Sequence, residues 1–312
     1  MRVVLAGGSG YIGARLAAAY LAEGAEVLVL TRGPGDARPG EHPGLRRVVW
    51  NGRDPGPWCD VLEGADLIVN LAGERVAGAG LGYRWTEARK RLLASSRVEA
   101  GRALVAGLAA CARRPSVFVQ ASGIDYYEAG EVEVSEEART GGGFLSRLVA
   151  EDWEPSTAGV ETLGIRRLVL RLGPVLGAGS PVLAPLVLQH RFYGGGPVGA
   201  GRQWFPWIAV EDLVAALRHL VGRDECEGAY NLVAPGILRN AELSKALGRA
   251  LDRPSWLPTP AFILRLVFGE MADTLLYGVR AVPMRLLETG YHFIRPDVDS
   301  ALAAALEPPS LA

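Results

Sequence analysis

Short apolar runs alternate with longer segments of helical periodicity through the first half of the chain. The runs are rich in valine and leucine and stop at glycine or at polar residues, which is typical of strands buried in a parallel sheet. Strands are predicted at residues 3–6, 26–30, 47–50, 66–71 and 117–120, with another inside 162–172, and helices at 11–21, 85–112 and 144–157. The alternation predicts an α/β fold, a doubly wound parallel sheet of Rossmann type with helices on both faces.

The pattern changes beyond residue 173, where glycine, proline and helical periodicity dominate. A glycine-rich loop is expected at 194–201, followed by helices at 210–221, 241–251 and 261–276. We therefore expect a nucleotide-binding Rossmann domain over residues 1–172. A smaller, mainly helical substrate-binding lobe over 173–312 would follow, with some of its segments returning to the sheet.

Three glycines follow the first predicted strand and open the first predicted helix. Gly7, Gly10 and Gly13 are spaced as in a dinucleotide-binding turn. A phosphate can approach main-chain N–H groups at a helix N-terminus only where no Cβ intervenes, and the third glycine permits close helix–strand packing. The pattern favours a dinucleotide site, and the alternative is a structural turn between strand and helix.

The second predicted strand ends next to Arg32. In a dinucleotide fold, the residue at this strand end meets the adenosine ribose, where a carboxylate favours NAD and an arginine accommodates a 2′-phosphate. We therefore predict that NADP(H) is preferred over NAD(H). The alternative is that Arg32 is an ordinary solvated loop charge.

Composition narrows the class of protein. The chain has 312 residues, a hydrophobic content of 49% and a net charge of −1 from 33 basic and 34 acidic residues. Such a balance, without long single-sign runs, predicts no nucleic-acid or membrane-surface partner. The N-terminal apolar run breaks at glycine, and no run approaches the ~20 residues of a membrane span. Cys59, Cys111 and Cys226 fit neither a disulfide framework nor a metal site, so we expect buried thiols, no metal and a cytoplasmic location.

Sequence blocks distributed along the whole chain carry a family resemblance. They include GGSGYIG at 7–13, NLAGE at 70–74, RWTEARK at 84–90, RLGPVLG at 171–177, GAGRQWFPWI at 199–208 and AYNLVAP at 229–235. On these blocks the chain resembles the extended short-chain dehydrogenase/reductase (SDR) superfamily, and in particular its atypical branch of YfcH-like "epimerase family" proteins.

The resemblance implies positions for the cofactor. The residues implied are Gly7, Ser9, Gly10, Tyr11 and Ile12 for the pyrophosphate, Leu71, Ala72 and Gly73 for the adenine-side ribose, and Pro174 and Val175 for the nicotinamide. The alternative for Leu71 and Val175 is that any α/β protein has apolar residues at its strand ends.

The usual catalytic pair of the superfamily is missing from this sequence. Typical members use a tyrosine with a lysine four residues later, because positions i and i+4 share one helix face. Motif alignment puts Phe144 and Leu148 at these positions. Ser122 matches the substrate-orienting serine, and Tyr126 or Tyr127 could supply a proton. The alternatives are a capping role for Ser122 and ordinary packing for the tyrosines.

Three functions remain open from the sequence. The first is an NADP(H)-dependent oxidoreductase acting on a small molecule, with Trp204 and Trp207 forming an apolar, substrate-binding lid, unless they are simply core residues. The second is a catalytically silent, NADP-bound sensor or scaffold, which the missing pair suggests. Sugar-nucleotide epimerisation, suggested by the family label alone, is the weakest. Related enzymes often dimerise through the long helices, here 85–112 and 144–157, so a homodimer is possible.

Overall fold

The computed structural model describes residues 1–33, 42–76 and 84–307. A seven-stranded sheet lies at its centre, in the order β11-β7-β5-β4-β1-β2-β3. Its strands are β1 (Arg2–Ala6), β2 (Glu26–Thr31), β3 (Leu45–Val49), β4 (Leu67–Asn70), β5 (Val117–Gly123), β7 (Arg166–Leu172) and β11 (Gly228–Leu232). Every neighbouring pair is parallel. The α/β class predicted from the sequence is confirmed.

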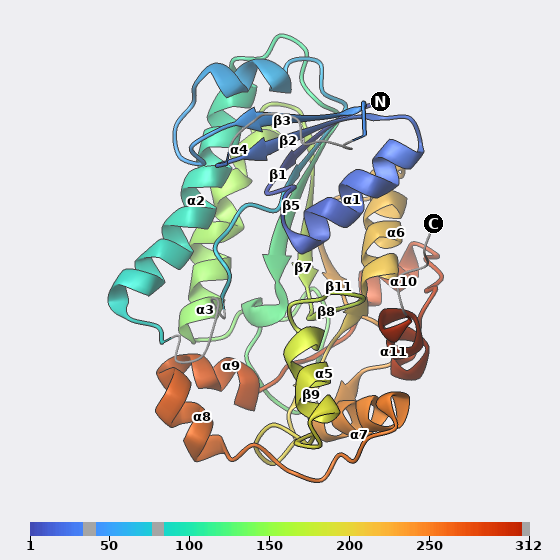
Figure 1. Ribbon diagram of the computed structural model, residues 1–312. Helices are drawn as coiled ribbons and strands as arrows, with labels where there is room; N and C mark the ends of the chain where they lie inside the picture. The colour runs from blue at the N-terminus through green and yellow to red at the C-terminus, as the bar shows by residue number, and fades with distance from the viewer. Residues whose placement is uncertain (34–41, 77–83, 308–312) are drawn as a thin grey trace.

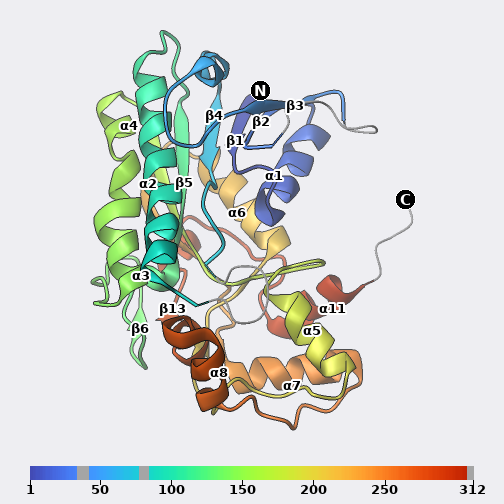
Figure 2. The same cartoon turned by 60° about the vertical axis from the view of Figure 1, so that its left-hand side comes forward.

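Helices cover both faces of the sheet because successive strand residues point to opposite sides. On one face, Val3 and Leu5 of β1 belong to a core shared with α1 (Tyr11–Ala22) and α6 (Val210–Val221). On the other face, Val4 and Ala6 belong to a core shared with α2 (Glu87–Ala109) and α4 (Gly159–Thr162). Figures 1 and 2 show these layers on either side of the strands.

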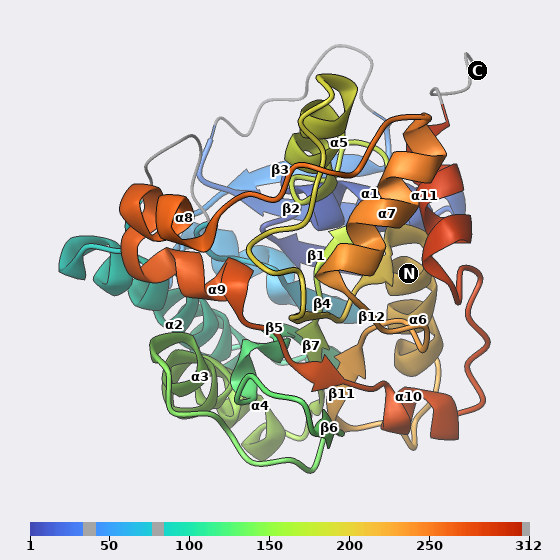
Figure 3. The same cartoon turned by 90° about the horizontal axis from the view of Figure 1, so that it is seen from below.

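Most of the remaining helices gather at the carboxyl ends of the strands (Figure 3). They are α5 (Leu183–Arg191), α7 (Asn240–Leu251), α8 (Ala261–Phe268), α9 (Asp273–Leu276) and α11 (Val298–Leu306). Helix α10 (Met284–Glu288) lies beside the start of β11 instead, where Arg285 donates to the carbonyls of Glu227 and Ala229 and Leu286 joins the core of α1 and α6. Three two-stranded ladders join the segments there: β8 (Val175–Leu176) with β10 (Ile208–Ala209), β9 (Trp204–Phe205) with β12 (Leu238–Arg239), and β6 (Glu133–Val134) with β13 (Arg280–Ala281). A separate apolar core holds α5, α7 and α11 together. In the described part of the chain, no helix combines the length and apolar character that a membrane crossing needs.

Two of the predicted helices are divided in the structure. Residues 144–157 form α3 (Phe144–Arg147), a π-helical turn (Leu148–Trp153) and a 3-10 turn (Pro155–Thr157), because Pro155 has no N–H to continue the ladder. Residues 261–276 form α8, a 3-10 turn (Gly269–Ala272) and α9, with Gly269 at a φ of 60° after α8. Further 3-10 turns, Pro57–Leu62 and Ile124–Tyr126, follow β3 and β5.

The strand order fixes where a ligand can bind. From β1 the chain proceeds to β2 and β3 on one side, and β4, β5, β7 and β11 extend the sheet on the other. The reversal therefore lies between β1 and β4, and open α/β sheets bind ligands outside the carboxyl ends of the strands at such a point. The predicted cofactor-binding and catalytic residues come from this edge, whereas Trp204 and Trp207 lie in segments of the helical lobe.

Candidate functional site

The turn after β1 has the form of a phosphate cradle. Gly7 has a φ of 77°, and a Cβ there would lie 2.7 Å from the carbonyl oxygen of Leu71. Helix α1 begins at Tyr11 behind Gly10, with no side-chain cap and no acidic residue in its first turn. Ser9 and Gly10 are exposed. The uncapped amides and the positive end of the helix dipole together suit an anion.

Gly13 brings α1 against the turn itself. A Cβ on Gly13 would lie 2.5 Å from the Cα of Gly8 and 2.8 Å from the carbonyl oxygen of Gly7. Since these are main-chain atoms, they cannot rotate away. The glycine spacing therefore has the steric basis that the sequence suggested.

Tyr11 and Ile12, both half-buried, occupy the first turn of α1. The Tyr11 ring lies beside the Arg15 guanidinium, whose Cζ is 5.7 Å from the ring centroid, and burial raises the pKa of its phenol. A Cβ on Gly177 would lie 2.5 Å from the Tyr11 hydroxyl oxygen. The first helix thus contacts the segment that follows β8.

The chain after β4 runs alongside the cradle. Asn70 donates through Nδ2 to Gln120 Oε1 at 3.0 Å and accepts through Oδ1 from the main-chain N–H of Ala72 at 3.1 Å. Leu71 and Ala72 are half-buried and Gly73 is exposed. The Asn70 side chain thereby fixes the turn that carries all three predicted ribose-binding residues.

Arg32 directly follows β2, as predicted, and forms an ion pair with Glu74. Its guanidinium donates to Glu74 Oε1 at 3.0 Å while 68% of its side chain stays exposed. Arg89 of α2 approaches the other Glu74 oxygen at 3.5 Å. The strand end therefore presents a positioned, accessible guanidinium.

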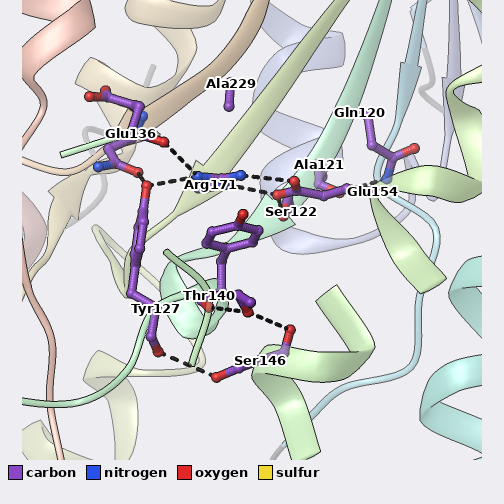
Figure 4. A network of polar contacts seen from close by, with 12 residues as sticks. Gln120, Ala121, Ser122, Tyr127, Glu136, Thr140, Ser146, Glu154, Arg171 and Ala229 are labelled. Carbon is purple, nitrogen blue, oxygen red and sulfur yellow. Dashed lines mark hydrogen bonds and ion pairs between the residues drawn. The ribbon is translucent and has the colours of Figure 1, made fainter. Parts of the chain in front are cut away.

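A buried polar network occupies the carboxyl ends of β5 and β7 (Figure 4). Ser122 donates to Glu154 Oε1 at 2.7 Å. Arg171 donates to both oxygens of Glu154, through Nε at 2.9 Å and through a terminal amino group at 3.0 Å. Burial lowers the pKa of Arg171, but the hydrogen bonds and charge of Glu154 raise it by more, so the guanidinium stays charged.

Tyr127 closes the other end of the same network. Its hydroxyl donates to Asn231 Oδ1 at 2.7 Å and accepts from Arg171 at 2.9 Å. The main-chain N–H of Asn231 in turn donates to the Glu136 carboxylate at 2.9 Å. Burial is the main reason why the pKa of Tyr127 is raised. The hydroxyl protons of Ser122 and Tyr127 are thus both committed to protein acceptors.

Tyr126 is placed differently from its neighbour. It is half-buried, and the Cζ of Arg171 lies 3.4 Å from its ring centroid, so the guanidinium stacks on the ring. Its hydroxyl takes no part in the hydrogen bonds that join Ser122, Glu154, Arg171 and Tyr127. Among the three predicted catalytic hydroxyl groups, that of Tyr126 is the one without a hydrogen-bond partner within residues 1–33, 42–76 and 84–307.

The two helix positions that would carry the usual tyrosine and lysine are apolar here. Phe144 packs edge-on against Trp85 at 5.5 Å, and Leu148 is buried in the same small core.

Pro174 and Val175 lie just past β7, where the Pro174 carbonyl accepts from the Ile208 N–H at 3.0 Å. Val175 is buried and Pro174 is half-buried.

The two predicted lid tryptophans have different environments. Trp207 is fully buried in the core of the helical lobe and donates to the Gly236 carbonyl at 3.0 Å, which favours the packing alternative. Trp204 is half-buried and donates to Glu131 at 3.1 Å. The Cζ atoms of Arg239 and Arg280 lie 4.0 Å and 5.0 Å from its ring centroid. Its ring therefore already has two cationic neighbours.

Sequence reasoning missed the acidic and basic members of this site. Arg171 and Asn231 lie within family blocks and Glu154 lies in the predicted helix 144–157, but no motif gives these three residues a role. The signal that could have found them is Arg171 itself, since an arginine inside an apolar strand requires a nearby carboxylate or carbonyl. Within the described residues, no three or more His, Cys, Asp and Glu side chains are grouped to hold a metal ion.

The sheet order, glycine cradle and strand-end residues together define a dinucleotide-binding protein of the extended SDR type. The chain belongs to the NAD dependent epimerase/dehydratase family, whose model matches residues 3–232. A domain of unknown function, DUF1731, matches residues 259–305. The family resemblance seen in the sequence is confirmed.

Relatives in this family match almost the whole chain. The mouse (Mus musculus) epimerase family protein SDR39U1 is 35% identical over 97% of this chain and 98% of its own length. Epimerase family protein YfhF of Bacillus subtilis is 32% identical over 97% of both chains. A crystal structure of human epimerase family protein SDR39U1 (isoform2) with NADPH matches with a TM-score of 0.86 and 32% identity, over 98% of this chain and 99% of that one.

Proposed function

We propose that this protein binds NADP(H) and works as an SDR-type oxidoreductase on a small molecule. The observation that carries the proposal is the glycine cradle beside an exposed arginine at the end of β2. The human SDR39U1 structure, which contains NADPH, supports it through near-complete structural overlap.

The residues present fit the cofactor, because a Cβ at Gly7 or Gly13 would collide with main-chain atoms that line the cradle. The residues that would hold it are Gly7, Ser9, Gly10, Tyr11 and Ile12 at the pyrophosphate, Arg32 at the 2′-phosphate, Leu71, Ala72 and Gly73 at the adenine-side ribose, and Pro174 and Val175 at the nicotinamide. When bound, the nicotinamide supplies or accepts a hydride.

In this proposal Tyr126 supplies the proton at the substrate oxygen. Arg171 stacks on its ring, and Glu154 keeps Arg171 in place. Ser122 and Tyr127 are positioning residues, because their hydroxyl protons already have acceptors inside the protein. Hydride transfer needs orientation and exclusion of water more than one particular acid, so such a site can operate without the tyrosine–lysine pair.

The first test is nucleotide binding, followed by turnover. NADPH should bind more tightly than NADH, and Arg32→Ala should weaken NADPH binding roughly ten- to hundredfold while NADH changes little. NADPH oxidation is then measured against aldehydes, ketones, quinones and enones. Tyr126→Phe should abolish any sustained oxidation, and Tyr193→Phe, on an exposed tyrosine distant in sequence, is the matched control. Equal binding of the two nucleotides would remove the role given to Arg32.

A second candidate, a cofactor-bound sensor or scaffold without turnover, rests on one observation. Phe144 and Leu148 replace the usual pair and are packed into an apolar core. Tight NADPH binding with no consumption across the substrate panel would favour this candidate. Sugar-nucleotide epimerisation is not proposed, since that reaction normally relies on the missing tyrosine and lysine.

Location and assembly complete the proposal. The three cysteines are free thiols in the structure, in keeping with a reducing cytoplasm, which cell fractionation would test. We also propose a homodimer through the helical segments 85–112 and 144–157, because related enzymes often dimerise through these helices. Light scattering of the purified protein at several concentrations would show a single monomeric mass if this is wrong.

A further inference from the structure

Glu74 is held rigidly at the end of the segment that follows β4. Its main-chain N–H donates to Ser96 Oγ at 3.0 Å, and its carbonyl accepts from Arg97 at 2.9 Å, both on α2. Arg97 is itself buried and also donates to the Leu93 carbonyl at 3.0 Å. The main chain at Glu74 is therefore anchored to α2.

The Glu74 side chain lies between two arginines with very different exposure. Oε1 accepts from Arg32 at 3.0 Å, and Oε2 lies 3.5 Å from Arg89. The exposed fractions are 68% for Arg32, 25% for Glu74 and 8% for Arg89. The hydrogen bond from Arg32, more than any other contact, keeps the pKa of Glu74 below its usual value. Glu74 is therefore an anion at neutral pH.

We infer that Glu74 lowers the affinity of this site for NADP(H). It thereby reduces the preference for NADP(H) over NAD(H) that Arg32 creates. This inference rests on the proposed cofactor. Arg32 attracts a 2′-phosphate, but the Glu74 carboxylate occupies one of its amino groups and opposes a second anion at the same guanidinium. A 2′-hydroxyl carries no charge to oppose and can donate a hydrogen bond to a carboxylate.

The contact with Arg89 explains how the carboxylate can remain when a phosphate arrives. If Arg32 turns toward a phosphate, Glu74 keeps its contact with the buried Arg89. When Arg32 changes its partner from Glu74 to the phosphate, each charged group still has a counter-charge. The change of partner therefore requires no rearrangement of α2. Glu74 therefore lowers the affinity for the phosphorylated nucleotide without blocking it.

The test compares the dissociation constants of NADPH and NADH for the full chain by fluorescence titration. Glu74→Gln keeps an acceptor for Arg32 and removes only the charge. NADPH should then bind roughly three- to tenfold more tightly, while NADH changes by less than about twofold. The gain should shrink at high salt. Glu99→Gln, which changes another carboxylate paired with an arginine (Arg53, 2.7 Å), should leave both constants unchanged.

Two further variants show whether Glu74 acts through Arg32. In the Arg32→Ala background, Glu74→Gln should lose most of its effect on NADPH, because the two substitutions are coupled. Glu74→Asp keeps the charge and should retain the wild-type ratio of the two constants. Unchanged or weaker NADPH binding by Glu74→Gln would overturn the inference, as would a full effect without Arg32. Failure of the unaltered protein to bind either nucleotide would instead overturn the proposed function.

Discussion

Replacing Glu154 by alanine leaves the Arg171 guanidinium without its carboxylate inside the protein. The two side chains are only 13% and 6% exposed. The substitution removes two hydrogen bonds from Arg171 and the acceptor of the Ser122 hydroxyl. Removing one partner of a buried ion pair costs about 3–5 kcal/mol, mostly because the other charge stays desolvated.

The hydrogen bonds that Arg171 keeps reduce this loss of stability. Arg171 still donates to the Tyr127 hydroxyl at 2.9 Å and to the Glu136 carbonyl at 3.2 Å. We therefore expect Glu154→Ala to lose about 3 kcal/mol of unfolding free energy, the lower end of that range. Glu154→Gln keeps the shape and one acceptor, so its loss should be smaller.

The free energy of unfolding is measured by urea titration, with circular dichroism as the signal. Glu99→Ala is the control, because its ion pair with Arg53 has side chains 35% and 64% exposed and should contribute little to stability. Replacing Glu154 and Arg171 together by leucine and methionine should restore part of the loss. A loss below about 1 kcal/mol for Glu154→Ala would refute the reasoning that the pair is buried and mutually dependent.

Three other changes test separate parts of the structure. Gly13→Ala should cost about 1–3 kcal/mol by urea titration and weaken NADPH binding measured by calorimetry, whereas Gly142→Ala, with open space around it, should do neither. Trp207→Ala should lose about 3–5 kcal/mol of unfolding free energy if the residue is core; a loss below 1 kcal/mol would contradict that. Burial, and to a smaller extent the charge of Arg223, lowers the pKa of His219 below its usual value of 6.5. The contribution of His219 to the free energy of unfolding is therefore fully present above pH 6.5 and decreases as the pH falls below that value. Melting temperatures between pH 7.5 and pH 5 should show a flatter decline for His219→Gln; an identical decline would assign the acid sensitivity elsewhere.

The sequence predicted those parts of the fold that local pattern determines. Six of the seven strands of the main sheet, all but β11, and helix α6 were predicted to within a few residues, because buried parallel strands need continuous apolar runs and a helix needs its periodicity. The glycine turn was predicted because steric demand leaves few alternatives to glycine at Gly7 and Gly13. In each case a short stretch of sequence carries the signal, even where the contact itself is with a distant residue, as between Gly7 and Leu71.

The parts that sequence reasoning missed depend on contacts between distant segments. Strand β11 has only a short, partly polar sequence, and its place comes from pairing with β7. The pairing of Glu154 with Arg171 depends on a turn of helix facing a strand. The aromatic cluster in the sequence leaves Trp207 open between a lid and a core position, and in the structure the lobe packs around it. Local sequence cannot separate a tryptophan that faces a ligand from one that fills a core.

The strand order has a consequence for how the chain can be divided. Strand β11 completes the sheet beside β7, although about 55 residues of chain, much of it in the helical lobe, separate the two in sequence. A fragment ending at residue 172 would therefore leave β7 as an open, apolar edge without its partner. Such edges invite aggregation, so the nucleotide-binding half is not expected to be a soluble module that can be expressed, exchanged or evolved independently of the rest.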